Sequence, residues 1–114
     1  MKKSTVTTLK KLGVPPHLLG HDYIGYAAEL LTEDRSYLRR MTKALYPKIA
    51  EKFGTTAPRV ERAIRHAIEV SVENITPDEY QEFYGNTVSP RKDKPVNSQF
   101  LAAVANMLEY PDPE

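Results

Sequence analysis

Apolar side chains recur at intervals of three to four residues along most of the chain, and no segment alternates apolar and polar residues with a period of two. The first spacing places side chains on one face of an α-helix, whereas strict alternation would indicate a half-buried strand. Proline, glycine and short polar runs divide the pattern into separate segments. The sequence therefore predicts an all-α fold, a compact bundle of about six helices, with helical segments over 4–12, 22–31, 34–46, 47–53, 58–73, 77–84 and 99–108.

Proline and glycine mark several of these boundaries. Pro47 either ends the segment over 34–46 or opens the next one, and Gly54 is placed to stop the helix that follows. Thr76 is expected to be an N-cap because Pro77 and two acidic residues come directly after it.

A basic surface loop is expected between the last two helices. Residues 86–96 hold two prolines and four consecutive charges, of which three are positive and one is negative. Lys94 belongs to this run, with Arg91 and Lys92. After the loop, Asn97 or Ser98 is expected to cap the last helix.

The segment over 58–73 divides into an apolar and a polar half when it is placed at 100° per residue. Any surface helix would show such a division, and the spacing of Glu61, Arg65 and Glu69 suits salt bridges on a solvated face. Two interpretations therefore remain open, a solvated face and a surface that reads a partner. The apolar half contains Val60, Ala63, Ile64, Ala67, Ile68 and Ser71, and the polar half contains Arg59, Glu61, Arg62, Arg65, His66, Glu69 and Glu73.

The residues before this segment favour the second interpretation. Ala50 is followed four residues later by Gly54, with Ile49 and Phe53 beside them. A small residue where two helices touch, a glycine for a left-handed turn and apolar contacts that close the angle are typical of a helix-turn-helix. We therefore expect residues 58–73 to be the recognition helix, with its outer face free to enter the major groove of DNA.

The exposed side chains near the start of this helix suit base reading. Arg59 and Arg62 carry planar guanidinium groups that match the O6 and N7 atoms of guanine, and Glu61 can accept a hydrogen bond from cytosine N4. A recognition site that contains G·C pairs is the chemical expectation.

Other polar residues of the region suit the sugar-phosphate backbone or the edge of the site. Thr55 and Thr56 lie in the turn, where hydroxyls and free main-chain N–H groups bind phosphate. Arg65 and His66 lie one turn further along, and Lys94 would add charge if the fold brings it to the same side.

Composition limits the other possibilities. The chain has 114 residues, a formal net charge of +1 and no cysteine, so we expect one domain over 1–114 with an ordered core of about 8–109, no disulfides and no thiolate zinc site. No apolar run is long enough to span a membrane, and the first residues lack the apolar core of a signal peptide. A cytoplasmic protein is therefore expected.

The sequence gives little support to other kinds of site. His17 and His21 are four residues apart, as metal ligands on a helix would be, but Pro15, Pro16 and Gly20 argue against a helix there and no third ligand is evident. No phosphate-binding loop or catalytic triad appears, so we expect no enzyme activity and no cofactor. The seven tyrosines mostly fall on apolar stripes, so single-stranded nucleic-acid binding is only a weak alternative.

Several runs resemble a known family. "LYPKIAEKFGTTAPRVERAIRHAIEV", "YGNTVS", "KPVNSQFLAAVANML" and "LGVPPHLLGHDYI" are similar to the C-terminal DNA-binding effector domain of the sporulation response regulator, stage 0 sporulation protein A, over about residues 10–108. The resemblance implies a six-helix transcription regulator of sporulation genes that binds short promoter boxes, often as tandem copies, and contacts the RNA polymerase sigma subunit. It also implies base reading by Arg59, Glu61 and Arg62.

The chain departs from the family in ways that add expectations. Pro58 stands where a small residue is usual, so the recognition helix is expected to start at Pro58, with Thr56 just before the cap. No receiver module is present, which implies either a fragment or a free-standing relative. The alternative function is a protein-interaction module of the same fold that acts on a regulator or a polymerase without binding DNA specifically.

Overall fold

A computed structural model describes residues 1–85 and 94–110. This part of the chain contains no strand, and its helical content confirms the all-α class. A 3₁₀ segment and a π-helical segment separate the second and third α-helices. The elements are α1 (Lys3–Lys11), α2 (Leu19–Glu33), η1 (Arg35–Arg39), η2 (Met41–Leu45), α3 (Tyr46–Phe53), α4 (Ala57–Glu73), α5 (Pro77–Tyr84) and α6 (Asn97–Glu109).

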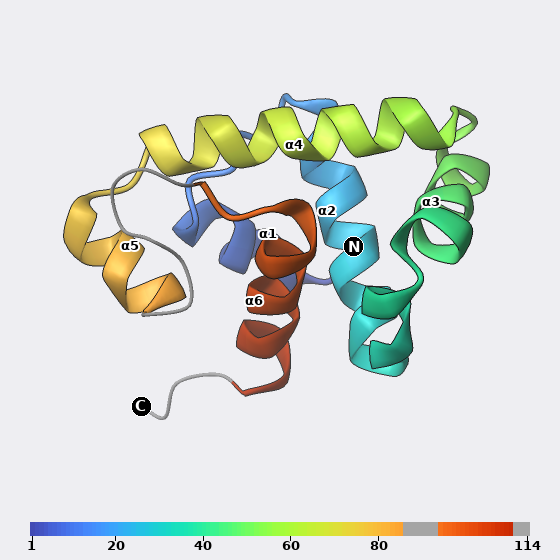
Figure 1. Cartoon of the computed structure of the whole chain (residues 1–114). Coiled ribbons are helices and arrows are strands. Elements are labelled where there is room, and N and C mark those ends of the chain that lie inside the picture. Colours follow the sequence, from blue (N-terminus) through green and yellow to red (C-terminus); the bar gives the residue numbers. More distant parts are fainter. Residues whose placement is uncertain (86–93, 111–114) are drawn as a thin grey trace.

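The longest helix, α4, lies across one side of the molecule, with α3 at its start and α5 beyond its end (Figure 1). Helices α2 and α6 pack beneath it, so one long face of α4 is buried and the opposite face is left open. The apolar half predicted for this helix is the buried one, although Ala63 is only partly covered. The largest fully buried side chains of the core are Phe100, Leu9, Leu12, Ile24, Leu31, Leu45, Ile49, Ile64, Ile68, Leu101, Val14 and Val60.

Hydrogen bonds to the end of α1 fix the C-terminal half of α4. The hydroxyl of Ser71, which is fully buried, donates to the main-chain oxygen of Leu12 at 2.5 Å. The side-chain amide of Asn74 donates to the main-chain oxygen of Gly13 at 3.0 Å. Gly13 has φ +79°, a left-handed conformation that ends α1 and turns its carbonyl toward α4.

The prediction of one regular helix over 34–46 is wrong. The Asp34 side chain accepts hydrogen bonds from the main-chain N–H and the hydroxyl of Ser36, which also hold the pKa of Asp34 below its ordinary value. Arg40 leaves helical geometry with φ −134° and ψ 40°, and its carbonyl oxygen then accepts from both Ala44 and Leu45. Pro47 has no N–H to continue the ladder, and it is the second residue of α3, in the first turn, where that N–H is not needed.

Helix α2 begins at Leu19, three residues before the predicted start at residue 22. Gly20 was treated as a break in the sequence pattern, but it lies inside the helix against α4. A Cβ atom there would overlap the main-chain oxygen of Ala63 and lie 2.6 Å from the Cβ of Ala67. The glycine therefore allows two helices to pack closely and does not end one.

The capping predictions succeed for α5 and fail for α6. Thr76 and Glu79 form a reciprocal capping box at the start of α5, as the sequence predicts. Asn97, by contrast, is the first residue of α6 and not its cap, and the side chain of Gln99 instead accepts from the main-chain N–H of Val96 at 3.1 Å.

Most of the predicted basic loop, with Arg91 and Lys92, lies outside the described residues, which resume at Lys94. No helix in the described ranges combines the length and the apolar character that crossing a bilayer requires.

Candidate nucleic-acid interface

The turn between α3 and α4 has the features expected of a helix-turn-helix. Gly54 adopts a left-handed conformation with φ 66° and ψ 39°, and the N–H of Thr55 donates to the carbonyl of Ala50 at 3.0 Å. Ala50 and Ile49 are buried where the two helices meet. Phe53 is partly exposed, and its ring lies 5.1 Å from that of Tyr23 on α2.

Helix α4 begins at Ala57, so the prediction that it starts at Pro58 is wrong by one residue. Thr56 is the N-cap, with extended backbone and a side-chain oxygen that accepts from the N–H of Arg59 at 3.4 Å. Pro58 occupies the second helical position, where a missing N–H costs nothing because no intrahelical acceptor awaits it.

Two arginines stand exposed on the open face of α4 without a carboxylate partner in the described parts of the chain. These are Arg59 and Arg62, the two residues to which the sequence assigns guanine reading. The Nε of Arg62 makes only a long contact of 3.4 Å with the carbonyl of Pro58. Both guanidinium groups therefore keep nearly all of their donors available.

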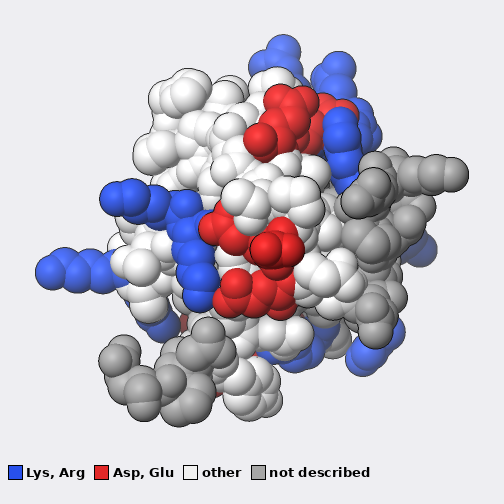
Figure 2. All heavy atoms as spheres, turned by 90° about the vertical axis from the view of Figure 1, so that its left-hand side faces the viewer, with Lys and Arg blue, Asp and Glu red and all other residues white. Residues whose placement is uncertain are grey.

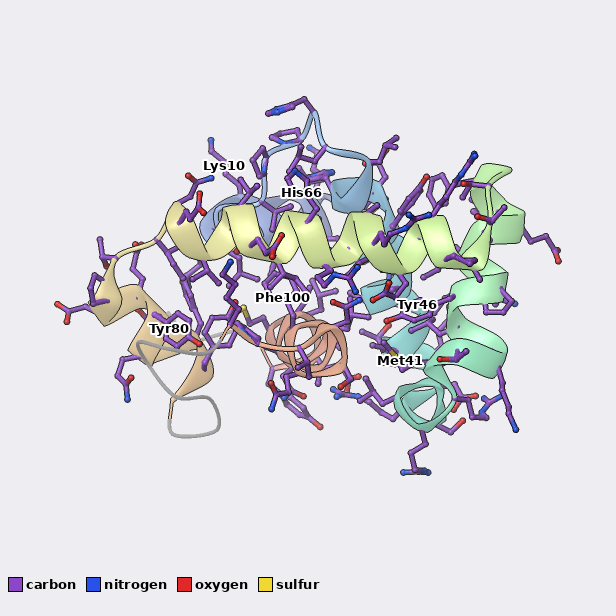
Figure 3. The ribbon with its side chains drawn as sticks, turned by 45° about the horizontal axis from the view of Figure 1, so that its top comes forward. Lys10, Met41, Tyr46, His66, Tyr80 and Phe100 are labelled. Carbon is purple, nitrogen blue, oxygen red and sulfur yellow. The ribbon has the colours of Figure 1, made fainter. Side chains whose placement is uncertain are left out.

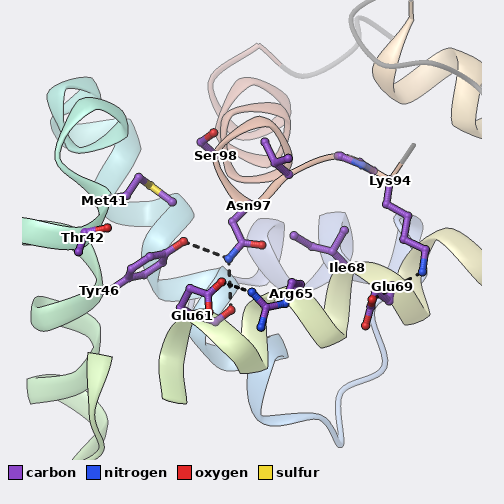
Figure 4. Close-up of a pocket in the computed structure, with 12 residues that line it drawn as sticks. Met41, Thr42, Tyr46, Glu61, Arg65, Ile68, Glu69, Lys94, Asn97 and Ser98 are labelled. Atoms are coloured by element: carbon purple, nitrogen blue, oxygen red, sulfur yellow. Dashed lines mark hydrogen bonds and ion pairs between the residues drawn. The ribbon is translucent and has the colours of Figure 1, made fainter. Parts of the chain in front are cut away.

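The third predicted base reader has a different environment. Glu61 lies on the flank of α4 that faces α6, where it is partly exposed and forms an ion pair with Arg65. Both residues line a groove of about 520 Å³ between α4, the segment that begins α6 and the start of α3 (Figure 4). Base reading by Glu61 stays a prediction, and it would require the carboxylate to leave Arg65.

One polar side chain at the bottom of this groove joins three helices. The amide nitrogen of Asn97 donates to the hydroxyl oxygen of Tyr46 at 3.0 Å and to the main-chain oxygen of Glu61 at 3.2 Å (Figure 4). Burial raises the pKa of Tyr46 above its ordinary value, with the hydrogen bond from Asn97 acting against this shift. Neither residue stands out in the sequence as part of a site, because Tyr46 falls on an apolar stripe and Asn97 is at a position expected for a cap.

Lys94 lies beside the C-terminal half of α4, and its contact with DNA stays a prediction. Its ammonium group is 3.6 Å from the carboxylate of Glu69, and His66 approaches the same carboxylate at 4.0 Å. All three side chains are about half exposed, so these contacts contribute little to stability. His66 lies on the side of α4 opposite to Tyr46 and Phe100 (Figure 3).

The charges of α4 run against its own dipole. The first turn has no acidic residue and contains Arg59, whereas the last turn has no basic residue and contains Glu73. Acidic side chains stabilise the N-terminal end of a helix and basic ones the C-terminal end, by about 0.3 to 1 kcal/mol each. A face that served only stability would favour the reverse order, so the cations at the start of α4 indicate an anionic partner.

The opposite end of the molecule is rich in acidic groups. Figure 2 shows two groups of acidic side chains on the end where α4 finishes and α5 lies, with basic side chains beside them. Glu73, Asp78 and Glu82 of these two helices are exposed. Glu73 thus lies at the opposite end of α4 from Arg59.

The two histidines considered as metal ligands lie in different environments. The Nδ1 of His21, which is buried, lies 2.9 Å from the carboxylate of Asp22, and His17 is exposed. Among the described residues, no group of three or more histidine, aspartate or glutamate side chains could hold a metal ion.

Comparison with known families agrees with this geometry. A family model described as sporulation initiation factor Spo0A C terminal matches residues 5–108, which is nearly the whole chain. The match includes the turn, all of α4 and all of α6 up to Leu108. The chain therefore belongs to the family of Spo0A C-terminal domains, the DNA-binding effector domains that regulate transcription in sporulation.

Proposed function

We propose that the chain binds double-stranded DNA sequence-specifically and regulates the transcription of sporulation-type genes. The observation that carries the proposal is the pair Arg59 and Arg62 at the start of α4, exposed and without a carboxylate partner among the described residues, in a chain of this family. The start of α4 would enter the major groove while α3 lies across the sugar-phosphate backbone.

Within this proposal the polar residues have distinct roles. Arg59 and Arg62 read guanine, and Glu61 accepts from cytosine once the DNA has drawn Arg65 to a phosphate. The Thr56 hydroxyl already accepts from the N–H of Arg59, but its hydrogen remains free to donate to a phosphate oxygen. Thr55, Arg65, His66 and Lys94 would then bind the backbone or the edge of the site.

The proposed partners are promoter DNA, a second copy of the chain and the RNA polymerase sigma subunit. A chain of 114 residues offers a small DNA interface, so useful affinity would come from paired or tandem sites. The sigma contact rests on the family alone. Binding to promoter DNA and to the polymerase would both take place in the cytoplasm, with the chain acting as one effector domain.

The test is a selection of duplexes by the wild-type chain from a random pool, followed by titration of the selected duplex and a scrambled duplex of equal length and composition. Arg62→Ala should weaken binding to the selected duplex by about 1 to 3 kcal/mol, or about 5- to 150-fold in Kd, and relax the preference at one base pair. Arg39→Ala, an exposed arginine of η1, is the matched control and should change little.

The rival function predicts a different result. A protein-interaction module of the same fold would enrich no sequence in the selection, and Arg62→Ala would bind both duplexes as the wild type does. Either result would exclude sequence-specific DNA binding by α4.

A further inference from the structure

The side chain of Asn97 is placed to control the orientation of the recognition helix. A carboxamide has two N–H donors on one nitrogen, and the two acceptors of Asn97 belong to different helices of the helix-turn-helix. Tyr46 is the first residue of α3, and Glu61 lies in the second turn of α4. The carbonyl of Glu61 can only accept, so the amide nitrogen must be the atom that faces it.

The two hydrogen bonds of Asn97 are directional, whereas the apolar contacts between α3 and α4 are not. Helices α3 and α4 meet through apolar side chains such as Ile49 and Val60, and apolar burial tolerates small rotations of one helix against the other. Hydrogen bonds weaken steeply when their angles depart from linearity. A single amide bonded to both helices therefore restricts their relative rotation.

The position of the α4 contact matters for base reading. Glu61 lies between Arg59 and Arg62 in the sequence, so a shift of its main chain moves both guanidinium groups. Bidentate recognition of a base edge requires the side chain to be held within about 0.5 Å of its productive position. Contacts to phosphate by flexible cations tolerate far larger displacements.

The bonds are present in the chain without DNA. Tyr46 is only 7% exposed and Asn97 is partly buried, and both line the groove beside α4. If the amide were removed, the Tyr46 hydroxyl and the Glu61 carbonyl would each lose a protein partner. The directional contacts between α6 and the two helices would be lost with it.

We propose that Asn97 is a positioning residue for DNA recognition, which bridges α6 to both helices of the helix-turn-helix and so fixes the arginines of α4 for base reading. The role rests on the proposed DNA-binding function. It predicts that loss of the amide lowers the preference for one sequence over another and leaves general affinity for DNA intact.

The principal variant is Asn97→Asp in the full chain. It keeps the shape of the side chain, replaces both donors by a carboxylate that the Glu61 carbonyl repels, and introduces a negative charge that the N-terminal end of α6 favours. Asn97→Ala removes the group altogether, and Tyr46→Phe removes only one of the two acceptors. Asn106→Ala is the matched control, because Asn106 also lies on α6 but its side chain accepts from Arg35 of η1, at 2.8 Å, instead of donating to α3 and α4.

The first measurement compares Kd for the duplex selected by the wild-type chain and for its scrambled counterpart. The preference, defined as Kd for the scrambled duplex divided by Kd for the selected duplex, should fall about three- to tenfold in Asn97→Asp and Asn97→Ala, and less in Tyr46→Phe. Binding to the scrambled duplex should stay unchanged within about twofold. The control should keep the wild-type ratio. If the Asn97 variants fail to fold, the ratio measured for Tyr46→Phe decides.

The second measurement needs no DNA. In the free protein, Tyr46→Phe should shift the NMR resonances of the Asn97 side-chain amide, because that amide loses an acceptor. Wild-type ratios in the folded Asn97 variants, or an unshifted amide, would overturn the proposal. A wild-type chain that binds both duplexes equally would refute the proposed function and this role with it, whereas the amide shift would still show whether the bonds exist.

Discussion

At the scale of single residues, Thr56 combines two functions that can be separated. Its oxygen caps α4 by accepting from the N–H of Arg59, and its hydrogen remains free for a phosphate. An aspartate can also cap a helix, and its charge suits the N-terminal end of the dipole. It cannot donate to a phosphate, however, and it would repel one.

We expect Thr56→Asp to keep the free energy of unfolding within about 0.5 kcal/mol of wild type and to weaken binding to selected and scrambled duplexes alike. Thr56→Ala should instead lose about 1 kcal/mol of stability. Urea denaturation and fluorescence titration measure the two effects. The same change at the cap of α5, Thr76→Asp, is the control. If both caps respond alike in the DNA titration, Thr56 has no phosphate contact.

At the scale of elements, the sequence predicts a helix well where its signals are local. The faces of α4 follow from the helical period, and α5 follows from Thr76, Glu79 and the glycine after it. The segment over 34–46 was mistaken because its apolar stripe continues through a 3₁₀ and a π-helical segment. A periodic pattern does not reveal that the Asp34 side chain competes for main-chain donors.

Two features escaped prediction because they depend on partners far away in the chain. Gly20 reads as a helix breaker, and only the approach of the α4 backbone explains why a glycine is required there. Asn97 reads as a cap, but its acceptors are 51 and 36 residues away. The chemistry of the side chains was enough to name candidates for base contact. It was not enough to predict the groove beside α4 in which Asn97 bonds to Tyr46 and Glu61.

The two glycines of α2 lead to opposite predictions. At Gly25, an added Cβ would meet the flexible end of Met1, whose sulfur is 2.6 Å away and whose side chain is largely exposed. Gly25→Ala should therefore gain about 0.5 to 1 kcal/mol from helix propensity. At Gly20, the same gain is outweighed by overlap with the main chain of α4, so Gly20→Ala should lose about 1 to 3 kcal/mol.

Thermal and urea denaturation of the two alanine variants would test the close packing of α2 and α4. Since both substitutions are made in one helix with the same residue, helix propensity cancels in their difference. Equal changes in stability would mean that α2 and α4 lie further apart than the structure places them.

At the scale of the whole molecule, the positions of the charged side chains matter more for DNA binding than the net charge does. The net charge of +1 gives no general attraction to DNA, so attraction must come from the local cations at the start of α4. At the other end, acidic side chains of α5 and the end of α4 lie next to basic ones (Figure 2). Because few cations are available for contact with DNA, the salt dependence of binding should report the phosphate contacts of individual side chains.

Lys94 is the cation whose role the salt dependence can decide. Each phosphate contact that is lost lowers the slope of log K against log salt by about 0.9, so we expect Lys94→Gln to lower it by that amount and to weaken selected and scrambled duplexes equally. Lys94 also neutralises Glu69, from which it is 3.6 Å, so removing it exposes a carboxylate on α4. The double variant Lys94→Gln with Glu69→Gln separates the two effects. A direct phosphate contact predicts that the slope stays low in the double variant, whereas a return to the wild-type slope would show that Lys94 only screens Glu69.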